Sequence, residues 1–261
     1  MIKKKLLEDD ALVVKSVGKA FEVLKCFEQT SQSEKELSLM DICRLTGFDK
    51  STAQRFTHTL QMLGYINKNE SSRRYSLNLK VLDLAFHFLR NDAFIETVNP
   101  HLFELCQLSR CRVSLSLFDD TETVYAVRHQ YKSEYYSSSL LGKRVPIYCS
   151  GGGRSILACL DIGQRDDILD RSEFIAFTHH TVLDRQVILN EIELAGKKGY
   201  GLTKEQFVYG ELGLGAALVD RHGYPLAAIQ LAINQSEISP DEFEKKYAPM
   251  LLETVQRIGA Y

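Results

Sequence analysis

Polar side chains between Lys50 and His58 have the types and the spacing that read nucleic acid bases. They recur at intervals of three and four residues, so a helix would place them on one face, which carries no acidic residue. Glutamine pairs bidentately with adenine and arginine with guanine, while serine and threonine adapt to either base. The expected DNA-contacting set on this helix is Lys50, Ser51, Thr52, Gln54, Arg55 and His58.

Local signals around these residues predict two short helices joined by a tight turn. Ser38 is a good N-cap with Asp41 three residues later, and Gly47 suits the left-handed residue that ends a helix. Asp49 then caps a second helix, which Gly64 ends. A gap of about three residues between helices is typical of a helix-turn-helix.

A basic hairpin is expected directly after this pair of helices. Residues 65–68 and 74–77 alternate as strands do, around a turn-rich loop at 69–72. The cationic residues Lys68, Arg73 and Arg74 would direct this wing toward phosphate or the minor groove. The alternative is a helix-turn-helix used only for packing, with a solvated polar face.

A second chemically distinctive segment is Ser150-Gly-Gly-Gly-Arg154. Three glycines let a backbone approach a ligand closely, and a following helix offers free N–H groups to an anion, to which Arg154 would add a charge-assisted bond. The segment lacks the Gly-Lys-Ser/Thr ending of a phosphate-binding loop, and Tyr148 occupies the first glycine position of a nucleophile elbow. The competing interpretation is a helix entry whose glycines permit close packing.

Charge separates the two ends of the chain. The whole chain of 261 residues has a net charge of −2, but residues 1–92 carry 15 Lys and Arg against 12 Asp and Glu. Residues 93–261 carry 17 against 22. A mildly basic head on an acidic body favours nucleic acid contact through the head alone.

The six cysteines and seven histidines show no metal-ligand or redox spacing, so we expect no metal and no cofactor. Free buried thiols suit a reducing, cytoplasmic location. The absence of an apolar run of about 18 residues argues against a membrane partner.

These motifs, taken in order, resemble those of the IclR family of bacterial transcription regulators, from about Val17 to Ala260. The first helix, the helix-turn-helix and the later glycine-rich segments all contribute. The matching segments are Lys19–Phe27, Leu39–Ile66, Gly142–Ala158, Gly199-Tyr200, Gly210–Asp220 and Gly223.

The resemblance implies an α+β protein. A winged helix-turn-helix domain at residues 13–78 and a linker helix at 79–92 would precede a GAF-like α/β effector-binding domain at 93–261, with a mainly antiparallel sheet. It also implies double-stranded DNA with palindromic operators, a small-molecule effector, and a homodimer or homotetramer. Repressor and activator remain alternatives at this stage.

Residues of the effector site are carried over from the same resemblance. The resemblance gives Ser150, Gly151, Thr203, Glu205, Gly213, Leu214, Gln230 and Ala232. The glycine-rich segment adds Gly152 and Arg154, and Tyr148, Tyr125 and Tyr136 are aromatic lining candidates. Family members often have bulkier or hydroxyl-bearing residues where Gly213 and Ala232 stand. We therefore expect a roomier pocket than one made for a two-carbon acid, and an organic, aromatic or sugar-derived acid as the effector.

Several element boundaries are also expected. Ser16 would cap a first helix with Val17, Phe21, Leu24 and Phe27 facing inward, and Pro100 would open a helix. Asp184 and Pro240 would start two later helices. The linker helix has a wide apolar stripe, which either a partner subunit or its own effector domain would cover.

A different class of function is an enzyme or small-molecule sensing module whose helix-turn-helix mediates protein contacts only. Such a protein needs a catalytic constellation. The histidines His129, His179 and His180 are scattered along the chain with Glu205, and they do not form one. We therefore expect no enzymatic activity.

Overall fold

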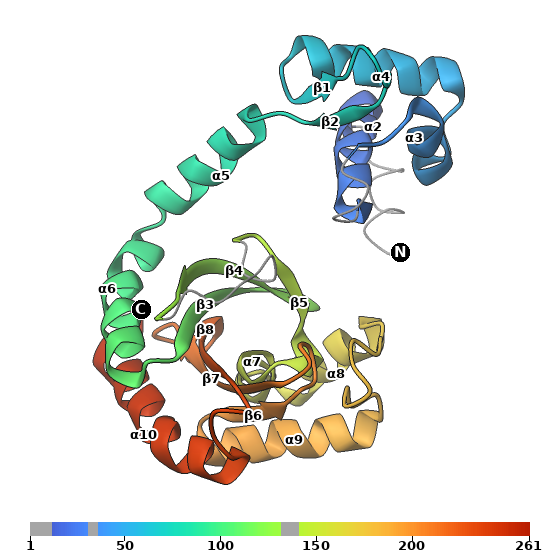
Figure 1. The fold of residues 1–261 in the computed structure, drawn as a ribbon. Helices are drawn as coiled ribbons and strands as arrows, with labels where there is room; N and C mark the ends of the chain where they lie inside the picture. Colours follow the sequence, from blue (N-terminus) through green and yellow to red (C-terminus); the bar gives the residue numbers. More distant parts are fainter. Residues whose placement is uncertain (1–11, 31–35, 132–140) are drawn as a thin grey trace. The chain divides into compact units, whose positions relative to one another are not determined.

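The computed structural model describes residues 12–30, 36–131 and 141–261, and the chain divides into two compact units at Asn91 and Asp92 (Figure 1). The first unit contains α2 (Lys15–Lys25), the 3-10 helix η1 (Cys26–Gln29), α3 (Leu39–Thr46) and α4 (Lys50–Met62). The hairpin β1 (Ile66–Lys68) and β2 (Tyr75–Leu77) and the helix α5 (Lys80–Asn91) follow.

The expected caps form the helix-turn-helix. Ser38 and Asp41 make a reciprocal capping box at α3, and Gly47 ends that helix in the left-handed conformation, with φ of 74°. The Asp49 carboxylate accepts the backbone N–H of Thr52 at 2.9 Å and starts α4. Ile42, Ala53, Leu60, Ile66 and Tyr75 are among the residues that join these elements in one buried cluster.

The expectation for the first helix is wrong in two respects. Helix α2 starts at Lys15 with Val14 as an uncapped N-terminal neighbour, so Ser16 is not the cap. Val17 and Phe21 are 53% and 56% exposed, whereas Val23 is fully buried. A helix turns by about 100° per residue, so Val17 and Phe21 lie on the far side from Val23.

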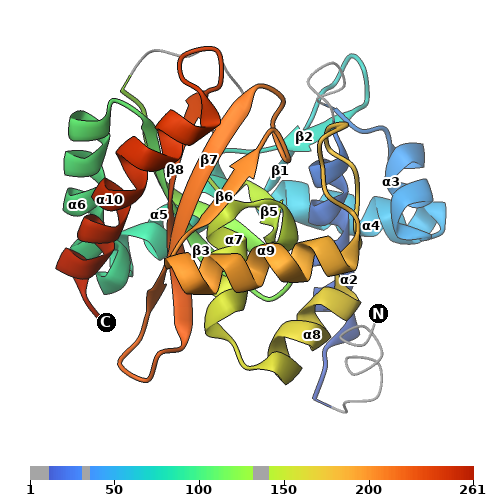
Figure 2. The same cartoon turned by 90° about the horizontal axis from the view of Figure 1, so that it is seen from below.

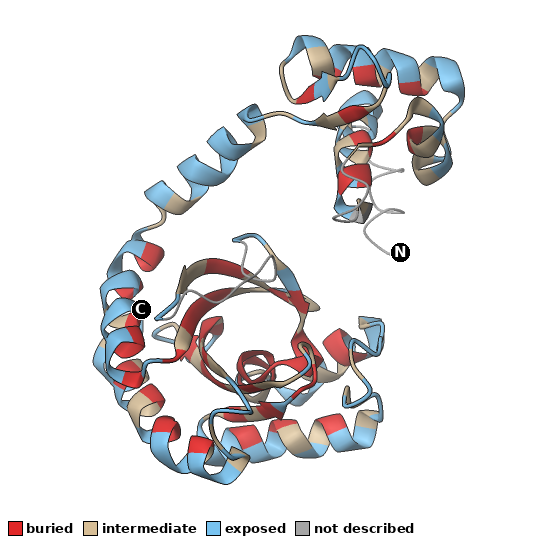
Figure 3. Ribbon diagram, in the orientation of Figure 1, coloured by how far each residue is buried: buried red, intermediate tan, exposed pale blue. Residues whose placement is uncertain are grey.

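Helix α5, which corresponds to the predicted linker, has no buried residue (Figure 3). Its exposed apolar side chains include Leu82, Leu84, Phe86 and Phe88.

The second unit is built on six antiparallel strands in the order β5-β4-β3-β8-β7-β6. They are β3 (Arg112–Asp119), β4 (Glu122–His129), β5 (Arg144–Pro146), β6 (Gly201–Lys204), β7 (Glu211–Val219) and β8 (Pro225–Asn234). The sheet curves around α7 (Gly151–Cys159), which follows the 3-10 helix η3 (Ile147–Cys149), as Figure 1 shows. Together with the first unit, this gives the α+β fold with a mainly antiparallel sheet.

Helices cover both faces of this sheet. The outer face carries α6 (Ala93–Ser109) and α10 (Pro240–Ile258), and α9 (Arg185–Lys198) packs against α7 and β6 (Figure 2). The remaining helix is α8 (Ile162–Arg171). Asp184 caps α9 and Pro240 is the first residue of α10, as expected. Among the described residues, no helix combines the length and the apolar character needed to cross a membrane.

Pro100 does not open a helix, because α6 begins seven residues earlier with Asp92 as its N-cap. Proline removes one backbone donor inside a helix and frees the carbonyl four residues before it, here that of Glu96. Pro100 and Glu96 are both exposed, so water can bind the freed carbonyl. Exposure to solvent therefore permits Pro100 inside α6, although local sequence rules place proline at a helix start.

Substitution of a glycine at the start of α7 can test how closely this helix must pack. A Cβ at Gly153 would clash with the backbone of Ile147, whereas a Cβ at Gly196 in α9 would meet only the Ala158 Cβ at 3.5 Å. Alanine normally favours a helix over glycine by about 1 kcal/mol. We expect Gly153→Ala to lower the free energy of unfolding by about 3 kcal/mol because of overpacking, whereas Gly196→Ala raises it or leaves it unchanged. Thermal denaturation measures both, and equal effects would contradict the close-packing argument.

Candidate functional site

The polar face of α4 is exposed as the sequence predicts. Lys50, Ser51, Gln54, Arg55 and His58 all have exposed side chains. The inward face is defined by Ala53, Thr57 and Leu60, which are buried. The Thr57 hydroxyl donates to the Ala53 carbonyl at 2.9 Å, so a polar side chain is accommodated in the interior.

Thr52 has a different environment from the other predicted α4 residues. It is half-buried, and its hydroxyl donates to the Asp49 carboxylate at 2.6 Å. Hydrogen bonds from the Thr52 hydroxyl and backbone hold the pKa of Asp49 below its usual value. Thr52 is therefore part of the helix cap, and the other five residues form the accessible face.

The three cations of the wing, residues 65–77, are held differently. Arg73 is exposed and lies 3.8 Å from Glu70. An ion pair between two solvated groups contributes little to stability. The Lys68 ammonium lies 5.5 Å from the centre of the Tyr75 ring. Arg74 donates to the Glu36 carbonyl at 2.9 Å and lies 3.9 Å from Asp41. Arg74 therefore ties the wing to the start of α3.

In the second unit, a cavity of about 30 Å³ lies between the sheet, the start of α7 and the loop that connects β6 with β7. Five predicted effector residues line it: Ser150, Thr203, Gly213, Gln230 and Ala232. Tyr125, suggested as an additional lining residue, also lies there. Sequence reasoning missed Val145, Cys149, Gln206, Phe207, Val208 and Glu211, which complete the wall.

The glycines of α7 have a packing role. Gly151 lies against the backbone of Gly201, and a Cβ at Gly152 would come 2.8 Å from the Ala228 Cβ. Neither glycine lines the cavity. The structure therefore agrees with the alternative interpretation of this segment, in which the glycines let α7 pack closely against the sheet.

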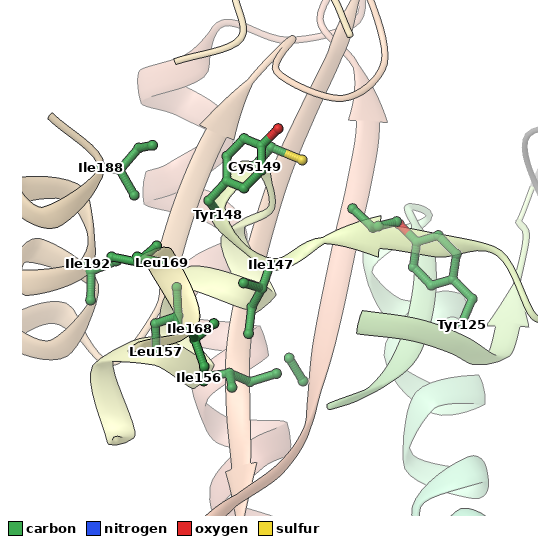
Figure 4. Close-up of a cluster of buried hydrophobic side chains, with 12 residues drawn as sticks. Tyr125, Ile147, Tyr148, Cys149, Ile156, Leu157, Ile168, Leu169, Ile188 and Ile192 are labelled. Carbon is green, nitrogen blue, oxygen red and sulfur yellow. The ribbon is translucent and has the colours of Figure 1, made fainter. Parts of the chain in front are cut away.

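Tyr148, Leu214 and Arg154 belong to the interior rather than to the cavity wall. The Tyr148 hydroxyl donates to the Ile175 carbonyl at 3.0 Å, and its ring packs within the buried cluster shown in Figure 4. Leu214 is buried, and Arg154 is fully buried. Tyr136 lies outside the described residues.

Glu205 holds the β6–β7 loop. Its carboxylate accepts the Gly210 backbone N–H at 2.8 Å and the Gln235 amide at 2.7 Å, and the Gly210 bond is the main cause of its lowered pKa. Its φ of 53° is unusual for a residue with a side chain. Glu205 thus shapes the loop that bears Gln206 and Phe207.

The cavity is smaller than expected, with room for about two water molecules. The reason is Thr203, which pairs with Gly213 across the sheet. A Cβ on Gly213 would lie only 2.8 Å from the Thr203 hydroxyl. Thr203 therefore fills the space that the missing side chain of Gly213 leaves, and a ligand larger than a few atoms must displace one wall.

Positive charge surrounds this cavity, although the sequence analysis did not identify it. Arg112 donates to the Glu211 carboxylate, and the Arg128 guanidinium lies 4.9 Å from the centre of the Tyr125 ring. The Lys143 ammonium lies 4.7 Å from the centre of the Phe207 ring. Burial lowers the pKa of Lys143, and the charges of Arg128 and Arg112 lower it further.

Strand register explains why these cations gather there. Thr203, Gly213, Ala232 and Arg112 form one row across four neighbouring strands. Gly215, Gln230, Ser114 and Arg128 form the next row on the same face. Alternation of Arg112, Ser114 and Ser116 with apolar residues on β3 is the sequence signal that indicates this polar face.

Comparison with known proteins identifies the family. A model of the bacterial transcriptional regulator IclR C-terminal domain matches residues 86–260, and one of the IclR helix-turn-helix domain matches residues 16–70. The chain belongs to the IclR family of bacterial transcription regulators. This IclR-family chain therefore has an N-terminal helix-turn-helix DNA-binding domain and a C-terminal ligand-binding domain.

Relatives agree with this assignment. The HTH-type transcriptional regulator KdgR of Dickeya chrysanthemi is 28% identical over 248 residues, which span 94% of this chain and 79% of KdgR. KdgR and the transcriptional repressor IclR of Escherichia coli (strain K12) are regulators, so this IclR-family chain is a regulator and not an enzyme.

Solved structures share the fold. An IclR transcriptional regulator from Alicyclobacillus acidocaldarius superposes with a TM-score of 0.79 at 19% identity, covering 94% of this chain and 97% of that one. An IclR homolog from Microbacterium hydrocarbonoxydans, complexed with 4-hydroxybenzoate, has a TM-score of 0.74 at 18% identity, with coverage of 93% and 97%.

The different structural roles of Arg74 and Arg73 in the wing can be tested by substitution. Arg74→Met removes the bond to the Glu36 carbonyl, and we expect it to lower the free energy of unfolding of the first unit by about 1 kcal/mol. Arg73→Met should leave stability within about 0.5 kcal/mol, because Arg73 is exposed. Chemical denaturation followed by circular dichroism compares the two, and equal stability of both variants would refute the structural role of Arg74.

Proposed function

We propose that this regulator binds palindromic double-stranded DNA through α4 and the wing as a homodimer or homotetramer, under the control of a small organic acid. The single observation that carries the DNA part is the exposed, acid-free face of Lys50, Ser51, Gln54, Arg55 and His58. Two half-sites would lie about one helical turn, or a multiple of it, apart.

Pairing of two copies is supported by α5. Its exposed apolar side chains, such as Leu82 and Phe86, cost free energy in water and suit contact with a second chain. We further propose a cytoplasmic location, since Cys26, Cys43, Cys106, Cys111, Cys149 and Cys159 are all free thiols.

An acidic effector is supported by the charges around the cavity. Arg112 pairs with the wall carboxylate Glu211, and Arg128 and Lys143 contact the wall residues Tyr125 and Phe207. The charges of Arg112 and Arg128 are felt at Lys143, where an added carboxylate would be attracted. We propose an organic acid, aromatic or sugar-derived, whose binding displaces one wall of the cavity. The Microbacterium homolog holds 4-hydroxybenzoate, an acid of this kind.

DNA recognition is tested on a duplex that the natural chain selects from a random pool. Each base contact is worth about 1–3 kcal/mol, so we expect Arg55→Ala and Gln54→Ala each to weaken binding at least about fivefold and to relax sequence preference. The exposed turn variant Arg221→Ala is the control. Gel shifts measure affinity, and circular dichroism verifies folding. Unchanged affinity in both α4 variants, or no selected duplex, would reject this proposal.

The role of Lys143 can be separated from fold stability. Because like charges and burial disfavour its ammonium, Lys143→Met should raise the melting temperature near neutral pH. This gain should shrink as pH rises through the lowered pKa of Lys143 toward the ordinary lysine value of 10.5, because the folded natural lysine has then lost its charge. The same change should weaken benzoate binding about tenfold, which is about 1.4 kcal/mol. Calorimetry with exposed Lys245→Met as control measures both. Unchanged benzoate affinity would exclude Lys143 from the site.

A further inference from the structure

The amide of Gln206 has a fixed orientation at the cavity wall. Arg154 donates from Nη2 to Gln206 Oε1 at 2.7 Å and from Nε to the Tyr148 carbonyl at 2.9 Å. A guanidinium has donors only, so the amide atom that meets it must be the oxygen. Within the described part of the chain, no group accepts a hydrogen bond from Gln206 Nε2. Gln206 lines the cavity, so its remaining amide N–H is a donor for a ligand bound there.

The amide of Gln230 is fixed in the opposite sense. Its Nε2 donates to the Ser116 hydroxyl at 2.8 Å. Ser116 is fully buried and uses its single proton toward the Ala228 carbonyl at 3.3 Å, so it can only accept from Gln230. The remaining amide atom, Gln230 Oε1, has no donor among the described residues. The wall therefore offers an acceptor here.

We propose that these two amides select a hydroxylated organic acid. An oxygen of the effector would accept from Gln206 Nε2, and a hydroxyl of the same effector would donate to Gln230 Oε1. Arg154 and Ser116 are positioning residues, because each acts on the effector only through the amide that it orients. This selectivity rests on the proposed effector function of the cavity.

The chemistry disfavours an acid without a hydroxyl group. Such a ligand would leave Gln230 Oε1 without a donor after displacing water, and a polar group deprived of its partner disfavours the complex. Gln230 is only half-buried, so the discrimination should be moderate, about tenfold to a hundredfold.

The test uses calorimetry on the full chain with matched acids: benzoate and 4-hydroxybenzoate, succinate and malate, hexanoate and gluconate. In at least one pair, the hydroxylated acid should bind the natural chain at least tenfold more tightly. Gln230→Met should bind both members of that pair equally. Ser116→Ala, which frees the Gln230 amide to turn over, should reduce the preference without removing it.

A second variant tests the donor. Gln206→Glu keeps an oxygen for Arg154 but replaces the N–H with another acceptor, so both acids should bind at least tenfold more weakly while the melting temperature is retained. Gln186→Glu adds the same charge to the exposed face of α9 and should change neither affinity more than twofold.

Three results would overturn the proposal. Equal binding of every matched pair by the natural chain, or a hydroxyl preference that survives Gln230→Met, would refute the amide assignment and leave the effector site standing. Unchanged affinity in Gln206→Glu would refute the donor. Binding of none of the six acids would defeat the effector function and the selectivity together.

Discussion

The guanidinium of Arg154 is buried where η3, α7, α9 and the β6–β7 loop meet, and the local arrangement of the second unit depends on how its charge is accommodated. Burial lowers the pKa of Arg154, and the Glu191 carboxylate, 3.7 Å away, opposes that shift. Taking an ion out of water costs several kcal/mol unless hydrogen bonds and an opposite charge compensate. The Tyr148 carbonyl, the Gln206 amide and Glu191 provide that compensation from three different segments. The charge thus fixes the positions of groups that are distant in sequence.

In the first unit, packing determines which residues remain outside. Ala53, Thr57 and Leu60 hold α4 against its neighbours, so its opposite face is determined by the helical period alone. Asp49 and Ser38 start the two helices through bonds that span only three residues. The exposed face therefore follows from local sequence, and its charges need no compensation from the rest of the chain.

Local signals predicted the fold well and the cavity only in part. The capping box at Ser38, the left-handed Gly47 and the start of α10 at Pro240 all depend on neighbours within a few residues, and the structure contains each of them. Local rules place Pro100 at a helix start, whereas exposure to solvent, a tertiary property, permits it inside α6. The role expected of Arg154 differed because partners more than 30 residues away decide whether a cation faces a ligand or the interior. The same reasoning accounts for Arg112 and Arg128, which only strand register brings together.

Thr203 and Gly213 are opposite each other on neighbouring strands, and the larger side chain uses the volume that the smaller one leaves. The side chains at these two positions therefore occupy the same volume between them. Family members could exchange bulk across this pair while keeping the capacity of the site constant. The residue at only one of these two positions would then give a misleading estimate of ligand size. The combined side-chain volume at positions 203 and 213 is the quantity to compare among related sequences.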